Sequence, residues 1–292
     1  MRRLFVTGDD FGHSRAVNRG IAEAYDRGLL TSASLMVAGE AAAEAIALAR
    51  DRPTLSVGLH LVLVDGRAVL PPGEIPSLVD TVGRFPARPF SAGLRYQFSA
   101  SAALDLRREI RAQLERFHDS GLPLDHVDGH HHFHLHPVVL GILLDLAEEF
   151  SISSIRLPSE ELGLALALDP RARATKILWS VVFGFLHRHA RRLLQERRIG
   201  FHERVYGLLA TGRITEEYLL GLIPRIQAES VEIYCHPAAA LPGEIGNSAS
   251  AERGVELDAL LSGRVAATAA ESGFVLQRRS LSPASSVPGN RK

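Results

Sequence analysis

Short strand patterns alternate with longer helical patterns along almost the whole of this 292-residue chain. The expected strands cover residues 4–8, 32–37, 55–60, 124–129, 153–157, 205–209 and 231–236, and a last short one covers 274–276. Helical periodicity fills most of the gaps between them, as at residues 39–50, 103–121 and 215–227. Strands that alternate with helices form parallel sheets, and about seven such units fit a closed barrel. We therefore expect an α/β fold of the TIM-like (β/α) barrel type, with its active site at the C-terminal ends of the strands.

The bulk composition fits a single enzyme-sized domain. Hydrophobic residues make up 46% of the chain, and the formal net charge of zero gives no reason to expect nucleic acid as a partner. The single cysteine, Cys235, excludes an intrachain disulfide framework. The first apolar strand is too short for a signal peptide, and no apolar run reaches the length of about 18 residues that a transmembrane helix needs. We expect a cytoplasmic protein whose barrel covers residues 1–278, with a disordered tail at residues 279–292.

The segment from Asp128 to Pro137 concentrates five of the chain's thirteen histidines within seven residues. It joins the strand expected at 124–129 to a helix that Pro137 opens, so the histidines occupy a strand-to-helix turn. Side chains of extended backbone alternate, which would place Asp128, His130 and His132 on one face. Imidazole is the commonest metal ligand in proteins, and a nearby carboxylate can fix its tautomer. A solvated histidine-rich loop or an adventitious metal site is the simpler alternative.

Acidic and histidine side chains also end the first and third predicted strands. Asp9 and Asp10 follow residues 4–8 and precede a helix that Ser14 can cap. Because adjacent side chains of a strand diverge, we expect the two carboxylates to have different roles. His60 ends a strand whose small residues share its face. Taken singly, the aspartates could form an acidic turn and His60 could be a satisfied core residue.

Two later strands end in polar residues as well. Arg156 lies near the end of residues 153–157, where it could contact a substrate oxygen or form a structural ion pair. In residues 231–236, Tyr234 and His236 alternate with Cys235, which falls on the apolar side and is expected to be a core residue, not a nucleophile. Six residues from five predicted strands share this edge: Asp9, Asp10, His60, His130, Arg156 and His236.

These residue types favour metal-assisted hydrolysis over covalent catalysis. One aspartate with two histidines is a ligand set for a divalent metal that keeps a position open for water. A second carboxylate can accept a proton from that water, and a further histidine can protonate the leaving group. The chain has no Gly-x-Ser-x-Gly elbow and no cysteine placed as a nucleophile.

Four motifs resemble those of the YdjC-like carbohydrate deacetylases, a group that includes chitooligosaccharide deacetylase and the hopanoid-biosynthesis-associated deacetylase. They are Thr-Gly-Asp-Asp-Phe-Gly at residues 7–12, Gly-Leu-His-Leu at 58–61, Asp-Gly-His-His-His-Phe-His at 128–134 and Tyr-Cys-His-Pro-Ala at 234–238. The resemblance covers residues 1 to about 278. Residues 62–72 and 122–127 are most similar to the hopanoid-associated subgroup.

The resemblance implies a TIM-like barrel, one divalent metal ion (magnesium or zinc) and removal of an acetyl group from an N-acetylated amino sugar. By position it implies Asp10, His60 and His130 as metal ligands, Asp9 as the general base and His236 as the acid. The substrate-binding residues are expected to include Arg156 and His132. His13 departs from the motif, because an apolar residue is expected there, and it could supply an extra ligand or a proton donor.

Two other functions stay open at this point. A metal-dependent hydrolase of another bond, such as a phosphoester, would need a second metal and more basic residues near the site. A non-enzymatic, membrane-associated partner in a lipid pathway would keep the histidines only as a structural or relic metal site. The amino sugar could be a chitooligosaccharide or be linked to a hopanoid lipid, and a homodimer is left open.

Two segments fall outside the barrel pattern. Residues 65–100 carry five prolines and little periodicity, and so long a loop could fold over the site as a lid. Residues 176–198 combine the aromatic residues Trp179, Phe183 and Phe185 with basic residues and contain no acidic residue before Glu196. Such a helix can lie on an anionic membrane, which would bring the protein to the inner face of the membrane. A barrel helix with an ordinary apolar face and solvated arginines is the alternative.

Overall fold

Seven parallel strands form one sheet at the centre of the molecule. The computed structural model of the chain describes residues 1–240 and 248–277, with side chains for all of them except residues 248–250. Six strands follow one another in the order β4-β3-β2-β1-β6-β5, and β7 pairs with β1 beside this path. Their bounds are Arg2–Phe11 (β1), Ser32–Leu35 (β2), Ser56–Leu61 (β3), Val127–Gly129 (β4), Arg204–Tyr206 (β5), Ser230–Cys235 (β6) and Phe274–Leu276 (β7). Every pairing is parallel, as the alternation of elements predicts.

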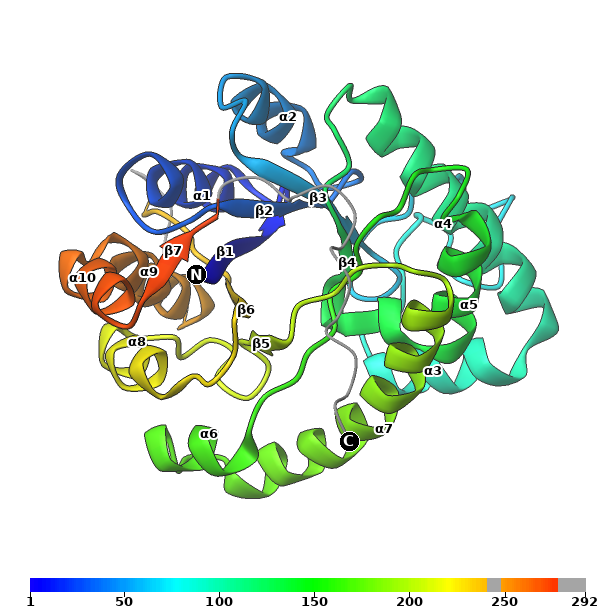
Figure 1. The fold of residues 1–292 in the computed structure, drawn as a ribbon. Helices are drawn as coiled ribbons and strands as arrows, with labels where there is room; N and C mark the ends of the chain where they lie inside the picture. Colours follow the sequence, from blue (N-terminus) through cyan, green and yellow to red (C-terminus); the bar gives the residue numbers. More distant parts are fainter. Residues whose placement is uncertain (241–247, 278–292) are drawn as a thin grey trace.

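Helices surround the sheet, whose strands curl about a common centre (Figure 1). Their bounds are Arg15–Arg27 (α1), Ala42–Arg50 (α2), Pro89–Phe98 (α3), Ala100–Asp119 (α4), Pro137–Leu146 (α5), Leu162–Leu168 (α6), Arg173–Glu196 (α7), Glu216–Leu222 (α8), Ser248–Leu261 (α9) and Gly263–Glu271 (α10). Two 3₁₀ segments, His130–Leu135 (η1) and Ile223–Arg225 (η2), follow β4 and α8. Helices α9 and α10 are separated by Ser262, whose side chain caps α10.

A complete barrel of seven strand–helix units is not confirmed. Residues 153–157, expected to be a strand, form only isolated parallel bridges, from Ile155 to Val127 of β4 and from Ser154 to Gly200 ahead of β5. Residues 153–157 thus connect β4, at one edge of the sheet, with the segment that precedes β5, at the other edge. The described residues thus confirm a parallel α/β fold with a sheet curled like half a barrel. The predicted disordered tail at 279–292 lies outside the described residues.

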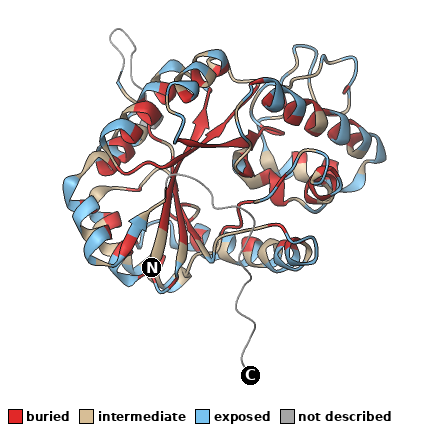
Figure 2. Ribbon diagram, turned by 45° about the horizontal axis from the view of Figure 1, so that its top comes forward, coloured by how far each residue is buried: buried red, intermediate tan, exposed pale blue. Residues whose placement is uncertain are grey.

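The hydrophobic core lies between the sheet and the helices (Figure 2). Leu4 and Val6 of β1 pack with Ile21 of α1 in one cluster of buried residues. On the opposite face of the strands the side chains are small or polar, as the sequence pattern of β3 predicts. A Cβ atom at Gly58 would lie 2.4 Å from the His126 ring, so glycine leaves the space that this imidazole fills. Because side chains alternate between the two faces of a strand, the face opposite the hydrophobic core is polar.

The segment between β3 and α4 is anchored on one side. It contains α3, which the sequence pattern did not predict. Three buried side chains of α4 hold its backbone: Gln113 accepts from Val62, Glu109 from Val69 and Leu70, and Asp105 from Ser77. Buried polar groups need such partners, and here they fix the path of an otherwise irregular chain. Motion of this segment as a lid stays a prediction.

Helix α7 covers most of the segment in which a basic amphipathic helix is predicted. One of its basic residues is placed differently from the expectation: Lys176 is 2% exposed, and its ammonium group binds Asp169 at 3.0 Å. Lys176 therefore adds no positive charge to the surface. Among the described residues, no helix has the length and hydropathy needed to cross a bilayer.

Candidate active site

The two aspartates that end β1 face different partners. The pairing of β1 with β2 shifts register between Gly8 and Phe11, and Asp10 adopts a left-handed conformation with φ of 64°. This irregularity allows both neighbouring carboxylates to lie on the site side of the sheet, where a regular strand would turn one of them away. Asp9 is 2% exposed and Asp10 1% exposed, yet both lie on the pocket wall. The two carboxylates have different partners, Arg156 for Asp9 and His130 for Asp10, but strand alternation does not turn them to opposite faces of the sheet.

His60 is held from behind by Asp128. The two residues are register partners in β3 and β4, and the His60 Nδ1–H donates to Asp128 Oδ1 at 2.8 Å. Ser34 of β2 donates to the other Asp128 oxygen at 2.8 Å. This arrangement fixes the His60 tautomer and turns Nε2 toward the pocket, 3.4 Å from Asp10. A carboxylate that orients a histidine was expected here, but the sequence did not identify which histidine.

The histidine-rich segment does not continue the strand. β4 ends at Gly129, and His131 and His132 have φ values of 51° and 57° within η1. We expected strand alternation to place Asp128, His130 and His132 on one face. That explanation is wrong, because the strand ends before His130. A tight left-handed turn, not an extended strand, brings His130 and His132 to the site. Strained backbone of this kind is concentrated at functional sites.

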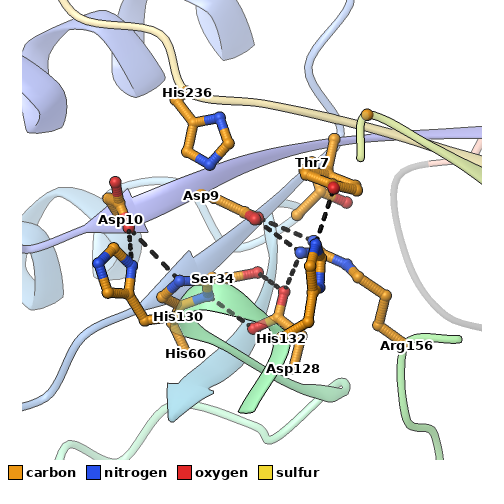
Figure 3. Close-up of polar contacts among 12 residues, drawn as sticks. Thr7, Asp9, Asp10, Ser34, His60, Asp128, His130, His132, Arg156 and His236 are labelled. Atoms are coloured by element: carbon orange, nitrogen blue, oxygen red, sulfur yellow. Dashed lines mark hydrogen bonds and ion pairs between the residues drawn. The ribbon is translucent and has the colours of Figure 1, made fainter. Parts of the chain in front are cut away.

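Asp10, His60 and His130 form a compact cluster (Figure 3). One ligand atom from each lies within 4.8 Å of the others. His130 Nδ1–H donates to Asp10 Oδ1 at 3.1 Å, whereas His60 Nε2 is buried with no hydrogen-bond partner among the described residues. An unpartnered buried ring nitrogen that faces a carboxylate is what a metal site provides, so these three residues fit a divalent cation.

The electrostatics of this cluster also favour a cation. Burial opposes ionisation of Asp10, yet the hydrogen bond from His130 and the nearby His60 ring hold the pKa of Asp10 well below its usual value. Burial would lower the pKa of His60, but the charges of Asp128 and Asp10 raise it to about 10. The carboxylates thus attract a positive charge to the His60 ring, and a metal ion or a proton can supply it.

Asp9 is held by a buried arginine. Arg156 Nη1 and Nη2 donate to the two Asp9 oxygens at 2.6 and 2.8 Å, and the same guanidinium contacts Asp128 at 2.6 Å and Glu232 at 2.9 Å. The Arg156 guanidinium carbon also lies over the Tyr234 ring, 4.6 Å from its centroid. A bidentate pair of this kind fixes the orientation of the carboxylate.

Arg156 is consequently not placed as a substrate ligand. Its side chain is fully buried, it is absent from the pocket wall, and its donors are directed to carboxylates. A contact with a substrate oxygen would require it to abandon one of these partners. The geometry favours the structural ion pair that the sequence left as the alternative.

His236 lies across the pocket from the histidine cluster. Its imidazole points toward the two aspartates (Figure 3) and its side chain is 20% exposed. The His236 backbone N–H donates to Glu256 Oε2 at 2.6 Å, and the same oxygen lies 3.9 Å from His236 Nδ1. Burial raises the pKa of Glu256, which α9 supplies. The sequence analysis did not identify Glu256 as part of the site.

Arg253 is a second residue that the sequence analysis missed. Its Nη2 donates to Asp10 Oδ2 at 2.6 Å, and its Nη1 is buried with no partner among the described residues. Arg253 thus occupies the carboxylate oxygen that His130 leaves free. No motif marked it, because it lies in the middle of a polar helical turn.

His132 faces the pocket, where it was predicted to bind substrate. Its Nε2 lies 2.8 Å from the Tyr234 hydroxyl. Burial, with His134 and Arg156 nearby, holds the pKa of His132 well below its usual value, so the ring is neutral near pH 7. Cys235, by contrast, is fully buried on the far side of β6, as predicted, and burial raises the pKa of its thiol.

The cavity above these residues has a volume of about 1430 Å³. Asp65, Arg67 and Arg84 of the β3–α4 segment line it, together with Trp179 and Phe183 of α7. The expected lid segment therefore forms one wall. His13 also lines the cavity but joins none of the described clusters of ligand atoms. Asp65 and His131 form a second cluster with His130, which is more exposed.

Comparisons with known proteins agree with this geometry. The family model described as YdjC-like protein matches residues 3–271. A carbohydrate deacetylase of Geobacillus stearothermophilus is 36% identical over 278 residues, covering 94% of this chain and 96% of that protein. The chitooligosaccharide deacetylase of Serratia marcescens is 33% identical over 284 residues, with the same coverage of 94% and 96%. A carbohydrate deacetylase of Brevibacillus brevis is 47% identical over 150 residues, a match that spans 51% of this chain and 57% of that relative.

A solved structure shares the fold. It is that of an Enterococcus faecalis V583 protein for which cleavage of cellobiose-phosphate has been suggested, with a TM-score of 0.73, 27% sequence identity and coverage of 94% and 96% of the two chains. The family match covers nearly all of the described residues and includes every member of the site. The chain belongs to the YdjC-like family.

Proposed function

We propose that this protein is a metal-dependent hydrolase that removes the N-acetyl group from an N-acetylated amino sugar. The observation that carries the proposal is the buried Asp10–His60–His130 cluster, with its unpartnered imidazole nitrogen, beside the separately held carboxylate of Asp9. The deacetylase names of full-length relatives support the choice of the acetamido group as the target.

Asp10, His60 and His130 would hold the metal ion, with magnesium and zinc as the candidates. A divalent ion bound there supplies Lewis acidity toward the substrate carbonyl and toward water. Asp128 keeps the His60 ring in the tautomer that leaves Nε2 free to bind. The Asp128 carboxylate is ready for this task because Arg156 and His60, acting against burial, hold its pKa well below the usual value.

Asp9 is the proposed general base and His236 the proposed acid. Asp9 lies on the pocket wall, and Arg156 aims its carboxylate, so that it can accept a proton from the attacking water. His236 stands on the opposite side and can donate a proton to the amine that leaves. Arg156 acts as a positioning residue in this scheme, through Asp9.

The pocket walls suit a sugar substrate. Trp179 and Phe183 give the cavity an aromatic wall, with ring centroids 5.7 Å apart, and His132 with Tyr234 gives a polar one. Such a combination of apolar surface and a few placed polar groups is usual for small-molecule pockets. The resemblance of residues 62–72 to the hopanoid-associated subgroup adds a lipid-linked amino sugar to the candidate substrates.

Hydrolysis of another bond, such as a phosphoester, is a second candidate. Four arginines line the cavity: Arg67, Arg84, Arg95 and Arg253. The Asp65–His130–His131 group adds ligand atoms that a second metal could use. Basic residues and a second metal are the two features that phosphoester cleavage needs.

An assay of two products separates these functions. The protein would be stripped with a chelator, reloaded with magnesium or zinc, and incubated with diacetylchitobiose, an N-acetylglucosaminyl hopanoid and cellobiose-phosphate. We expect acetate from an acetylated substrate, only after reloading. Phosphate release without acetate would favour the second candidate, and acetate release that persists undiminished after complete chelation would contradict the metal-dependent proposal.

A further inference from the structure

Large hydrophobic side chains are exposed in two stripes on the helices that line the pocket. Phe90, Leu94 and Phe98 of α3, which are spaced four residues apart, are 81%, 47% and 80% exposed. On α7, the stripe consists of Leu178, Val182 and Phe185, which are 60%, 37% and 64% exposed. Single exposed hydrophobic residues are ordinary, but contiguous apolar surface marks a binding face. These six residues are called the apolar rim below.

The apolar rim borders the pocket. Pro89 and Arg95 of α3 and Trp179 and Phe183 of α7 line the cavity, so both helices contribute one face to the cavity wall. Phe183 is also part of the buried core, and the α7 stripe lies on the opposite side of that helix, at the spacing of residues 178, 182 and 185. The apolar rim is thus surface that residues 1–240 and 248–277 leave exposed.

Positive charge continues the stripe on α7. Arg188 and Arg192 follow Phe185 at helical spacing, and the Arg188 guanidinium lies 4.7 Å from the Phe185 ring centroid. Arg192 is 71% exposed and lies 3.6 Å from Glu196, its neighbour one turn later. No acidic residue occurs between Lys176 and Gln195. An apolar half followed by a basic half is the charge pattern that complements an anionic bilayer.

We propose that the apolar rim, together with Arg188, Arg191 and Arg192, docks on an anionic lipid bilayer, which would bring the pocket that it borders close to the lipid. The apolar side chains would enter the boundary between headgroups and acyl chains, and the arginines would contact lipid phosphates. The docking rests on surface residues alone. Its consequence, that the amino sugar is presented on a membrane lipid, rests on the proposed function.

A second copy of the chain fits this surface less well. Two antiparallel α7 helices would press the arginine half of each against the apolar half of the other, and two parallel helices would bring arginines together. Neither arrangement brings a carboxylate of this segment to Arg188 or Arg191, because residues 176–195 contain no acidic residue and Glu196 pairs with Arg192. Burying unpaired arginines is costly, whereas lipid phosphates pair with them.

Co-sedimentation with vesicles tests the docking. The full chain would be mixed with phosphatidylglycerol or phosphatidylcholine vesicles, at low and high salt. One variant is Leu178→Gln with Phe185→Gln, and another replaces Arg188, Arg191 and Arg192 with Gln. The matched controls are Leu104→Gln, at a position 63% exposed on α4, and Gln at Arg15, Arg27 and Arg264, whose side chains are 80%, 71% and 72% exposed.

We expect the wild type to sediment with phosphatidylglycerol at low salt. The arginine variant should bind about a hundredfold more weakly to anionic vesicles, and the apolar variant at least about tenfold more weakly, while both controls bind like the wild type. Circular dichroism confirms folding, and acetate release from soluble diacetylchitobiose should not change, because none of these positions lines the pocket.

Three results would overturn the docking. They are a wild type that stays in the supernatant with every vesicle, controls that lose as much binding as the variants, or light scattering that shows Phe185→Gln dissolving a dimer while vesicle binding is unchanged. Failure of the deacetylase proposal is read separately, because a protein that releases no acetate can still bind vesicles.

Discussion

Asp9, Asp10 and His60 at the bottom of the pocket are at most 2% exposed, whereas Phe90 and Phe98 on the apolar rim are 80% exposed or more. The buried group sits on strand ends, where Arg156 and Arg253 donate to its carboxylates and Asp128 accepts from the His60 ring. The apolar rim sits on α3 and α7, and none of the described residues covers it. For the comparison, the polar floor denotes Asp9, Asp10, His60 and His130 with the Asp128 and Arg156 side chains behind them.

The difference separates two demands on one pocket. Catalytic groups need fixed orientation and low solvation, which the strands and the ion pairs provide. Presentation of a substrate needs exposed surface, which added helices provide at little cost to the core. The two regions should therefore respond to mutation in different quantities: turnover and metal content for the polar floor, and surface binding for the apolar rim.

The largest expected effect separates the two neighbouring aspartates. Asp9→Asn should retain the metal but lose roughly two to four orders of magnitude in turnover, the usual size of a general-base contribution. Asp10→Asn should instead weaken metal affinity, because its carboxylate faces His60 and His130. Acetate release and elemental analysis of both variants check this. If Asp9→Asn loses the metal and Asp10→Asn keeps it, the roles are reversed.

A smaller effect is expected for Asp128, which holds His60 from behind. Asp128→Asn removes the charge that orients His60, and such a change should cost about 10- to 100-fold in metal affinity or activity. Asp119→Asn is the matched control, since Asp119 is exposed at the end of α4 and does not line the pocket. Titration with zinc measures the affinity. Equal affinities for Asp128→Asn and the wild type would show that Asp128 does not act on the metal site.

The buried histidine turn predicts a pH dependence of stability. Burial lowers the pKa of His134 to about 4, so the folded state excludes a proton that the unfolded state binds below pH 6.5. Stability should thus fall as pH decreases from 6.5 toward 4, by about 2 kcal/mol at pH 5 from this residue. His134→Gln should flatten that slope in urea unfolding series. An unchanged slope would place the pH sensitivity elsewhere.

The apolar rim should give the smallest effect in solution. Leu178→Gln and Phe185→Gln remove exposed hydrophobic contacts and should change the free energy of unfolding by no more than about 0.5 kcal/mol. Thermal unfolding measures this, with Leu104→Gln as the comparison. A loss of several kcal/mol would mean that the stripe is part of the core of an assembly, and the contrast with the polar floor would fail.

The parallel arrangement and the positions of His60 and Cys235 were predictable because they depend on periodicity. Strand alternation places His60 on the small-residue face and Cys235 in the core, and both positions are confirmed. Ser14 caps α1 through its side chain, and Pro137 opens α5, as local rules predict. These features are set by neighbours in the sequence.

Features that depend on tertiary contacts were not predictable. A turn was expected at the histidines, but the left-handed conformation of His131 and His132 within it was not, because no local rule favours that conformation for histidine. The pairing of Arg156 with Asp9 joins residues 147 positions apart, and Arg253 reaches Asp10 across 243 positions. The sequence pattern predicted Lys176 as a surface charge, whereas the structure pairs it with the buried Asp169.

The central claim is that Asp10, His60 and His130 hold a divalent metal on which deacetylation depends. The most direct measurement is metal content by elemental analysis, together with acetate release, for His60→Ala and His130→Ala, with His118→Ala, an exposed position on α4, as the control. We predict that both site variants stay folded, hold less than one metal ion per chain and release no acetate, while the control matches the wild type. Full metal occupancy and full turnover in either site variant would contradict the ligand set and the function built on it.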